Sequence, residues 1–402
     1  MATTVTKVVD PNSGSGYDYA SLYDWEAAQQ GDLTGVRDEI AVAKCRCTGG
    51  TADTTNITID GWTTSATQYI KIWTDTSESY RHNGTYQTGN KYRFTGVLVY
   101  AESDALFDGI QFISTKTANG DFYPFQIYNT AVVMRLIVTN SIFKMINSEN
   151  YSGWSDGITG WYGGAAGSVF IIVNCIFDGI RSTGTSGSSG YLQDGAGTSY
   201  LYNCTFNNCQ HGPWGYSGTM YCKNCLANAC PGGDFMEVNV CTNCASSDGT
   251  ADDTDGSGGS GNRISQTFTF AGAADFHLAS NDAGALGYGL NLYNDAAYPF
   301  QTDIDGQDRG GAAASWDIGA DEYVLSASIE QEGFRFRNDD GTEATATWKA
   351  NQDVNITLAA NTAVRLRMLL NATGDPASIG AQLEYRYKPS GGAFGSWGKV
   401  VS

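Results

Sequence analysis

The sequence has few prolines, few histidines and few basic residues. Its 402 residues include 7 prolines and 3 histidines, and 23 Lys and Arg stand against 42 Asp and Glu. The formal net charge of −19 argues against a protein that binds nucleic acid through its phosphates, because such binding needs a surplus of cations. No run approaches the roughly 20 apolar residues of a membrane-spanning helix. We therefore expect neither a nucleic-acid partner nor a membrane span.

The three histidines, His82, His211 and His277, lie far apart in the sequence. No His-x-x-x-His pair and no Ser/His/Asp arrangement is visible, so metalloprotease and serine-hydrolase functions have no support. No glycine-rich phosphate-binding motif stands beside a predicted helix.

Residues 1–9 lack the apolar core of an export signal. Ten cysteines would nevertheless suit a secreted protein. Synthesis in a reducing cytoplasm followed by release in a larger particle would reconcile the two observations, as would a signal trimmed from the chain. We expect a virion or extracellular location.

The acidity is confined to the first part of the chain. Residues 326–402 hold 8 basic and 8 acidic residues, which leaves 15 basic and 34 acidic residues in the first 325. This change in composition predicts a domain boundary near residue 325. We divide the chain into an N-terminal cap at 1–45, a main domain at 46–325 and a C-terminal domain at 326–402.

A short pattern recurs in the middle of the chain. An asparagine followed by Ser or Cys and a short strand-like run appears five times, and the asparagines are 34, 29, 21 and 19 residues apart. They are Asn140, Asn174, Asn203, Asn224 and Asn243, and the last four are followed by Cys175, Cys204, Cys225 and Cys244. Repeats of about 20 residues around a short strand indicate a solenoid in which equivalent side chains form ladders. We expect the asparagines to form such a ladder at a turn, with the thiols inside.

An asparagine ladder beside small or sulfur-containing side chains resembles the right-handed parallel β-helix proteins of the pectate-lyase-like group, and within it phage tailspike and virion surface proteins. Residues 18–28 resemble the short helix that closes the N-terminal end of these proteins, and residues 303–323 are similar to their final coil. The resemblance covers roughly residues 5–325 and implies an all-β fold. It implies no single function, because this scaffold carries lyases, hydrolases, tailspikes and inert fibres.

The C-terminal domain shows a different periodicity. Residues 334–337, 364–368 and 383–388 alternate apolar with charged residues and are separated by Gly and Asn/Asp turns. This pattern predicts a small antiparallel β-sandwich. It resembles C-terminal modules appended to phage and environmental surface proteins.

The cysteines also offer a metal-site interpretation. Cys222-x-x-Cys225 and Cys241-x-x-Cys244 have the spacing of a zinc ribbon. The repeat explains the same spacing as one coil, so we expect no metal and an interior ladder of thiols. Disulfides Cys222–Cys241 or Cys209–Cys230 remain open in an oxidising setting. No cofactor is expected, although calcium binding at Asp252, Asp253 and Asp255 stays open.

Paired carboxylates are the remaining enzymatic option, because a glycosidase needs one protonated and one ionised group. Asp194 and Asp234 each lie ten residues before a ladder cysteine, so we expect them on one wall, two coils apart. Asp156 and Glu237 are further candidates.

The two long intervals of the repeat predict inserted loops that carry aromatic residues. Aromatic rings beside Asp, Asn and Gln suit sugars, which offer an apolar face and hydroxyls. The alternative is that the rings pack their own loops onto the solenoid. The candidate glycan-binding residues are Trp154, Trp161, Tyr162, Tyr191, Trp214 and Tyr216.

These observations favour a structural and adhesive surface protein, such as a phage tail fibre, tailspike or head decoration. Its expected partners are other virion proteins and host surface polysaccharide, and the family suggests a homotrimer. A polysaccharide-degrading enzyme on the same scaffold and a secreted bacterial adhesin are the alternatives.

Overall fold

The structure is a computed structural model. It describes residues 2–402 except 103, 130, 162, 184–186, 252–258, 312–313, 325–327, 343, 360, 374–383, 386–387, 389–390, 394–395, 397 and 400–402. The chain divides into two compact units, Met1–Tyr323 and Val324–Ser402. None of the described helices is long and apolar enough to cross a membrane.

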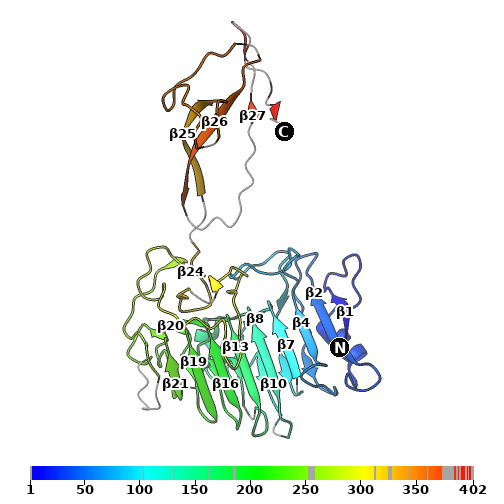
Figure 1. The fold of residues 1–402 in the computed structure, drawn as a ribbon. Coiled ribbons are helices and arrows are strands. Elements are labelled where there is room, and N and C mark those ends of the chain that lie inside the picture. The colour runs from blue at the N-terminus through cyan, green and yellow to red at the C-terminus, as the bar shows by residue number, and fades with distance from the viewer. Residues whose placement is uncertain are drawn as a thin grey trace. The chain divides into compact units, whose positions relative to one another are not determined.

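The first unit is built from three parallel sheets, and the first of them is drawn as a row of arrows in Figure 1. Its strands are β1 (Thr3–Val9), β2 (Glu39–Cys45), β4 (Ile70–Trp73), β7 (Asp104–Asp108), β10 (Arg135–Thr139), β13 (Val169–Val173), β16 (Thr198–Tyr202), β19 (Thr219–Lys223) and β21 (Val240–Thr242). Each strand pairs with the equivalent strand of the next coil, so the chain winds as a solenoid.

The other two sheets follow the same order. The second sheet contains β5 (Arg93–Phe94), β8 (Gln111–Thr115), β11 (Ile142–Ile146), β14 (Ile176–Asp178), β17 (Thr205–Asn207), β20 (Leu226–Asn228) and β22 (Ala245–Ser246). The third sheet contains β3 (Ile57–Ile59), β6 (Leu98–Tyr100), β9 (Phe125–Ile127), β12 (Asp156–Thr159), β15 (Ser189–Leu192) and β18 (His211–Trp214). The predicted all-β, right-handed parallel β-helix is confirmed.

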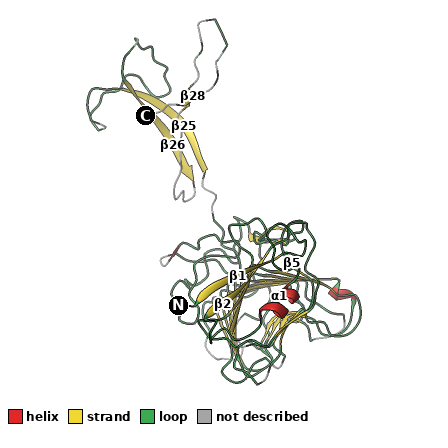
Figure 2. Cartoon of the chain, turned by 90° about the vertical axis from the view of Figure 1, so that its right-hand side faces the viewer, coloured by secondary structure: helices red, strands yellow, loops and turns green. Residues whose placement is uncertain are grey.

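The helix α1 (Leu22–Gln29) lies at the N-terminal end of the solenoid (Figure 2). It begins at Ser21, whose side chain accepts a hydrogen bond from the backbone N–H of Asp24. The helix buries Leu22 and Trp25, and Trp25 stacks on Trp62 with ring centroids 5.4 Å apart. A single 3-10 turn, Ser148–Asn150, stands between β11 and β12.

The turn between the first and second sheets explains the recurrent asparagine. Asn140, Asn174, Asn203, Asn224 and Asn243 all have φ between 48 and 52°. Their short polar side chains tolerate this left-handed conformation. The Asn174 amide donates to Asn140, and the Asn224 amide donates to Asn203, both at 3.1 Å. The backbone N–H of each of the first four asparagines donates to the next coil, so these positions lie in one column.

Like side chains also stack inside the solenoid. Phe112, Phe143, Phe177 and Phe206 stack in succession with centroids 4.8, 4.9 and 4.7 Å apart. The thiols that follow the ladder asparagines are fully buried. Cys204 Sγ, for example, lies 3.4 Å from the carbonyl oxygen of Ile172 in the preceding coil. No disulfide joins any of the ten cysteines, all of which are described and buried.

The segment 263–323 covers the outer faces of the first and second sheets. It contains the short strands β23 (Phe270–Gly272) and β24 (Asp275–Leu278). Leu292 and Trp316 pack on the first sheet, and Phe276 and Ile304 pack on the second. Arg309 is 1% exposed and bonds within this segment to Glu322, at 2.9 Å, and to three backbone carbonyls. It also donates to Asn174 Oδ1 of the solenoid at 3.2 Å, which fastens the segment to the asparagine ladder.

The second unit contains two antiparallel strand pairs. They are β25 (Ser328–Asn338) with β26 (Val364–Thr373), and β27 (Glu384–Tyr385) with β28 (Gly398–Lys399). The first pair contains the predicted strands at 334–337 and 364–368. Of the predicted strand at 383–388, residues 383, 386 and 387 lie outside the described residues. The described residues show a small antiparallel sheet pair, and the β-sandwich stays a prediction.

Candidate functional site

The outer face of the third sheet differs from the other two. Among the described residues, no part of 263–323 joins a hydrophobic cluster with this sheet. The strand register aligns one outward-facing column along it, formed by Thr58, Val99, Gln126, Thr159, Leu192 and Trp214. Five steps of about 4.8 Å make this column about 24 Å long. Two cavities and a row of aromatic rings lie along it, and we call this surface the third-sheet face.

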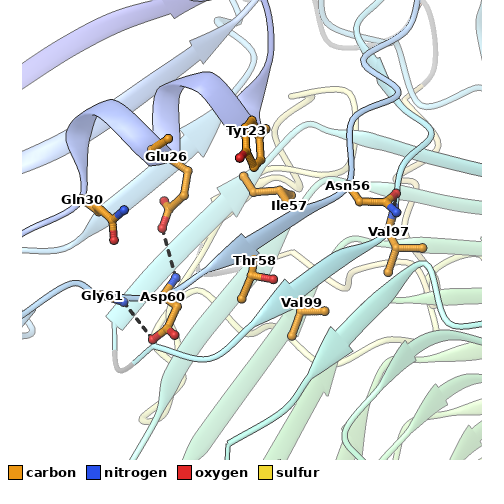
Figure 3. Close-up of a pocket in the computed structure, with 11 residues that line it drawn as sticks. Tyr23, Glu26, Gln30, Asn56, Ile57, Thr58, Asp60, Gly61, Val97 and Val99 are labelled. Carbon is orange, nitrogen blue, oxygen red and sulfur yellow. Dashed lines mark hydrogen bonds between the residues drawn. The ribbon is translucent and has the colours of Figure 1, made fainter.

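The larger cavity, of 510 Å³, lies between α1 and the first two strands of the third sheet (Figure 3). Its lining is formed by Tyr23, Glu26, Ala27, Gln30, Asn56, Ile57, Thr58, Asp60, Gly61, Val97 and Val99. Figure 3 shows Tyr23, Glu26 and Gln30 extending from the helix toward the strands. The cavity therefore combines an apolar strand surface with amide, hydroxyl and carboxyl groups.

Glu26 is the buried acid of this cavity. Its carboxylate accepts hydrogen bonds from Trp62 Nε1 at 2.8 Å and from the Asp60 backbone N–H at 3.1 Å. Burial, with a smaller contribution from the nearby charges of Glu102 and Asp60, raises the pKa of Glu26 to about 7 against these hydrogen bonds.

The aromatic row lies toward the other end of the face. Trp154 stacks on Trp161 at 5.8 Å and on Trp214 at 6.0 Å between ring centroids. Tyr123 meets the edge of Trp161 at 5.7 Å, and Tyr216 meets Trp214 at 5.6 Å. The row thus joins residues from three coils. Trp154 and Trp161 are half-buried and Tyr216 is 56% exposed, whereas Trp214 is 7% exposed and supports its neighbours.

The smaller cavity, of 170 Å³, adjoins this row. It is lined by Tyr123, Gln126, Tyr128, Thr159 and Trp161. Within the described part of the chain, the buried atoms Tyr123 Oη and Thr159 Oγ1 make no contact with the full geometry of a hydrogen bond, although the Asp121 carboxylate lies close enough to Tyr123 to help burial raise its pKa. Unsatisfied buried hydroxyls are uncommon in folded proteins, so they mark a place where a ligand or water can bind.

Asp156 lies on β12, three residues before Thr159, and is fully buried. Its Oδ1 accepts hydrogen bonds from the Ser189 N–H and hydroxyl, both at 2.8 Å, whereas its Oδ2 has no partner among the described residues. Burial raises the pKa of Asp156 to about 8 despite these bonds. Thr159 lies near enough to oppose that rise, although its contact lacks the geometry of a hydrogen bond. The carboxyl is therefore protonated at neutral pH.

The structure brings together only some of the predicted glycan-binding residues. Trp154, Trp161, Trp214 and Tyr216 form the row described above. Tyr191 was predicted on an inserted loop but is fully buried on β15, where its hydroxyl lies 2.7 Å from Ser199 Oγ. It cannot stack on a ligand. Tyr162 lies outside the described residues.

Asp194 and Asp234 lie along one wall, two coils apart as expected, but at different positions along the strand direction. The coil that contains Asp234 passes from the third sheet to the first in four fewer residues than the coil that contains Asp194. An equal number of residues before the ladder cysteine therefore does not give the two aspartates the same position along the strand direction. The register aligns Leu192, Trp214 and Met236, so Asp194 lies two residues beyond this column and Asp234 two residues before it, an offset of four residues. That offset corresponds to about 13 Å.

The carboxylates of Asp234, Asp194 and Glu237 each accept hydrogen bonds that hold part of the fold in place. Asp234 is fully buried and accepts hydrogen bonds from the backbone N–H groups of Cys230 and Ser247. Asp194 accepts the Ser217 hydroxyl at 2.9 Å. Glu237 is exposed and accepts the Trp214 indole N–H at 3.0 Å, so it positions that ring. All four candidate acids, Asp156 included, therefore hold hydrogen bonds within the fold.

Sequence reasoning missed the residues that form the cavities. Tyr123, Gln126 and Thr159 belong to coils in which the asparagine signature is absent or incomplete. In the first of these coils Gly109, with φ of 74°, takes the place of the ladder asparagine. A search for Asn or Gly before an apolar strand would have extended the repeat by one coil.

One group of side chains among the described residues could hold a metal ion. Ligand atoms of His277, Asp305 and Asp321 lie within 4.8 Å of one another, on the segment that covers the second sheet. His277 Nδ1 already lies 2.5 Å from Asp275 Oδ1. The four cysteines with zinc-ribbon spacing do not form such a group. The three aspartates of the proposed calcium loop, Asp252, Asp253 and Asp255, lie outside the described residues.

No family model and no curated protein matches the chain. A solved structure, the crystal structure of pectate lyase Pel9A, is similar to it at 13% sequence identity. The similarity covers 80% of this chain and 97% of that chain with a TM-score of 0.27. So low a score supports no statement about activity, and the fold rests on the sheets themselves.

Proposed function

We propose that this chain is a structural and adhesive surface protein that binds an extended glycan along its third-sheet face. The observation that carries the proposal is the stacked row in which Trp154 contacts both Trp161 and Trp214. Indole rings pack against the apolar faces of sugar rings, while the amide and hydroxyl groups beside them bond to sugar hydroxyls. The column of about 24 Å that joins the two cavities suits a linear chain of sugars.

The close packing of Gly187 on Trp154 supports a built surface. A Cβ at position 187 would lie 2.2 Å from Cε2 of Trp154. Any side chain there would push the indole away, so the loop and the ring fit one another. The row is therefore held in place before any ligand arrives, which lowers the entropy cost of binding.

We further propose that the protein is a component of a phage virion, such as a tail fibre, tailspike or head decoration. Ten buried cysteines without a disulfide suit a chain that folds in a reducing cytoplasm and reaches the exterior inside a particle. Other virion proteins and host surface polysaccharide would be its partners, and a homotrimer is the proposed assembly.

Affinity electrophoresis through gels that contain bacterial surface polysaccharides tests glycan binding. We expect at least one polysaccharide to retard the wild-type protein. Trp154→Ala and Trp161→Ala should each weaken retardation about fivefold, in line with the energy of one aromatic stacking contact. Trp348→Ala, at a 44% exposed position in the second unit, is the matched control and should leave retardation unchanged. Equal retardation of all four proteins would refute the stacking role.

The same polysaccharides distinguish binding from degradation. Incubation with the protein followed by assays for new reducing ends and unsaturated products would reveal a hydrolase or a lyase. The adhesive proposal predicts that neither product forms. Product formation that Asp156→Asn abolishes would replace it with an enzymatic function.

A further inference from the structure

The small cavity beside Trp161 has features of a specific subsite. Its volume of 170 Å³ is well below the usual range for a drug-sized ligand, so it can admit one small ring. Trp161 and Tyr123 meet edge to face at 5.7 Å on its wall, which connects the cavity directly to the aromatic row.

Polar groups in and behind the cavity are unsatisfied. Tyr123 Oη and Thr159 Oγ1 belong to residues that line it, and the fully buried Asp156 stands behind Thr159 with its Oδ2 unpartnered in the described part of the chain. A buried polar atom without a partner costs about 1–3 kcal/mol in folding, and a ligand hydroxyl would remove that cost. Two hydroxyls that can both donate and accept match the hydroxyls of a sugar ring.

The charges around the cavity are negative. Asp121 is exposed beside it, where its carboxylate accepts a hydrogen bond from the backbone N–H of Trp154 at 2.9 Å. Lys116 is the nearby cation, and its ammonium is held by Ser155 Oγ at 2.9 Å and by the Gly153 carbonyl at 3.2 Å. The described residues that line the two cavities of the third-sheet face include Glu26 and Asp60 but no Lys or Arg. A sugar carboxylate in either cavity would meet these acidic groups and no lining Lys or Arg with which to pair.

We propose that the cavity formed by Tyr123, Gln126, Tyr128, Thr159 and Trp161 is a subsite for one uncharged sugar ring, and that the third-sheet face selects neutral glycans over uronates. Tyr123 and Thr159 bond to the ring hydroxyls, and Trp161 packs on its apolar face. Asp156, protonated at neutral pH, keeps the floor of the subsite uncharged. This inference rests on the proposed glycan binding and adds the class of sugar.

The test compares matched neutral and anionic ligands. A glucan, a mannan and a galactan are each immobilised before and after oxidation of C6 to a carboxylate, at fixed ionic strength and pH 7. We expect the wild-type protein to bind at least one neutral polymer about tenfold or more tightly than its oxidised form, because an unpaired carboxylate costs at least as much as one lost charged hydrogen bond.

Two isosteric variants test the subsite itself. Tyr123→Phe and Thr159→Val each remove one hydroxyl and keep the shape of the side chain. Each should weaken neutral binding about 2- to 10-fold, the effect of one hydrogen bond. Tyr221→Phe, on the first sheet, is the control and should bind as the wild type. Thermal melting of every variant checks that a loss of binding does not reflect unfolding.

The outcomes separate this inference from the proposed function. If Trp154→Ala and Trp161→Ala lose binding while oxidised polymers bind as well as neutral ones, glycan binding stands and the selectivity is overturned. If Tyr123→Phe and Thr159→Val bind like the control, the subsite is overturned. If the wild-type protein binds no polymer in either form, both proposals fail together.

Discussion

Replacing Asp156 with Asn tests the electrostatics beneath the third-sheet face. In the unfolded chain an Asp carboxyl with the ordinary pKa of 3.8 is ionised above pH 4, whereas in the folded protein burial keeps Asp156 protonated up to about pH 8. Between these values the folded state binds one more proton than the unfolded state. The free energy of unfolding must therefore fall as the pH rises through this window.

The size of the effect follows from the pKa difference. Each pH unit between about 4 and 8 lowers the stability of the wild type by about 1.4 kcal/mol, so the loss between pH 4 and pH 7 is about 4 kcal/mol. Asn cannot ionise, and its side-chain oxygen can still accept both hydrogen bonds from Ser189. An unpartnered amide N–H₂ in place of Oδ2 costs about 1–3 kcal/mol at every pH. Asp156→Asn should therefore destabilise the protein slightly in acid and stabilise it at pH 7 and above.

Urea unfolding of the wild type and of Asp156→Asn at pH 4, 5.5, 7 and 8 measures this difference. Asp32→Asn is the control with the opposite sign. The hydrogen bond from the Thr34 hydroxyl, with those from two backbone N–H groups, lowers the pKa of the exposed Asp32. Removing this carboxylate should therefore lower the free energy of unfolding at neutral pH and not in acid. The reasoning is refuted if the wild type and Asp156→Asn lose stability in parallel from pH 4 to 8.

Three other substitutions or treatments give defined expectations. Asn203→Ala removes the buried amide that accepts a hydrogen bond from Asn224 and donates to two backbone carbonyls. Urea unfolding should show that the free energy of unfolding falls by about 2–4 kcal/mol, and a fall below about 0.5 kcal/mol would contradict the role of the ladder. Arg309→Met leaves the buried Glu322 without its charged partner, with the Asp317 backbone N–H still donating to it, and should cost about 3–5 kcal/mol. Early proteolysis within 263–323 should accompany this loss, and resistance equal to that of the wild type would show that other contacts hold this segment. The ten cysteines should not react with a thiol reagent in the native protein and should all react in denaturant. The reason is that they are buried, and burial raises the pKa of thiols such as Cys204. Rapid labelling of several cysteines in the native state would disprove their interior position.

The first two sheets could be predicted from the sequence because one turn separates them. That turn requires a left-handed residue, and Asn supplies it in five coils at 140, 174, 203, 224 and 243. The apolar residues on either side of each asparagine then form the two strands. A local backbone requirement that repeats is visible in a single sequence.

The third sheet could not be predicted in the same way. Its strands β12, β15 and β18 contain Gly157, Gly190, Gly212 and Pro213, which are typical of turns and of sheet edges. A Cβ at Gly157 or Gly190 would lie within 2.7 Å of Ile180 or Phe206, so close packing of the interior requires these glycines. The repeat intervals therefore predict inserted loops where β12 and β15 lie, and with them an exposed position for the buried Tyr191.

The aromatic row was predicted in part. Trp154, Trp161 and Trp214 stood out because large rings are unusual in polar, glycine-rich stretches. Their mutual stacking depends on the winding of the chain, which brings the rings of Trp154 and Trp214, 60 positions apart, to 6.0 Å between centroids. Tyr123 and Thr159 carry no sequence signal of their own, and only the three-dimensional arrangement shows that their hydroxyls adjoin the row.

Hydroxyl-radical footprinting of the tryptophans, with and without a retained polysaccharide, tests the central claim most directly. Glycan binding on the third-sheet face predicts that oxidation of Trp154 and Trp161 falls several-fold when the polysaccharide is present, while oxidation of Trp348 in the second unit stays the same. Unchanged oxidation of Trp154 and Trp161 by a polysaccharide that demonstrably binds would place the binding surface elsewhere on the protein.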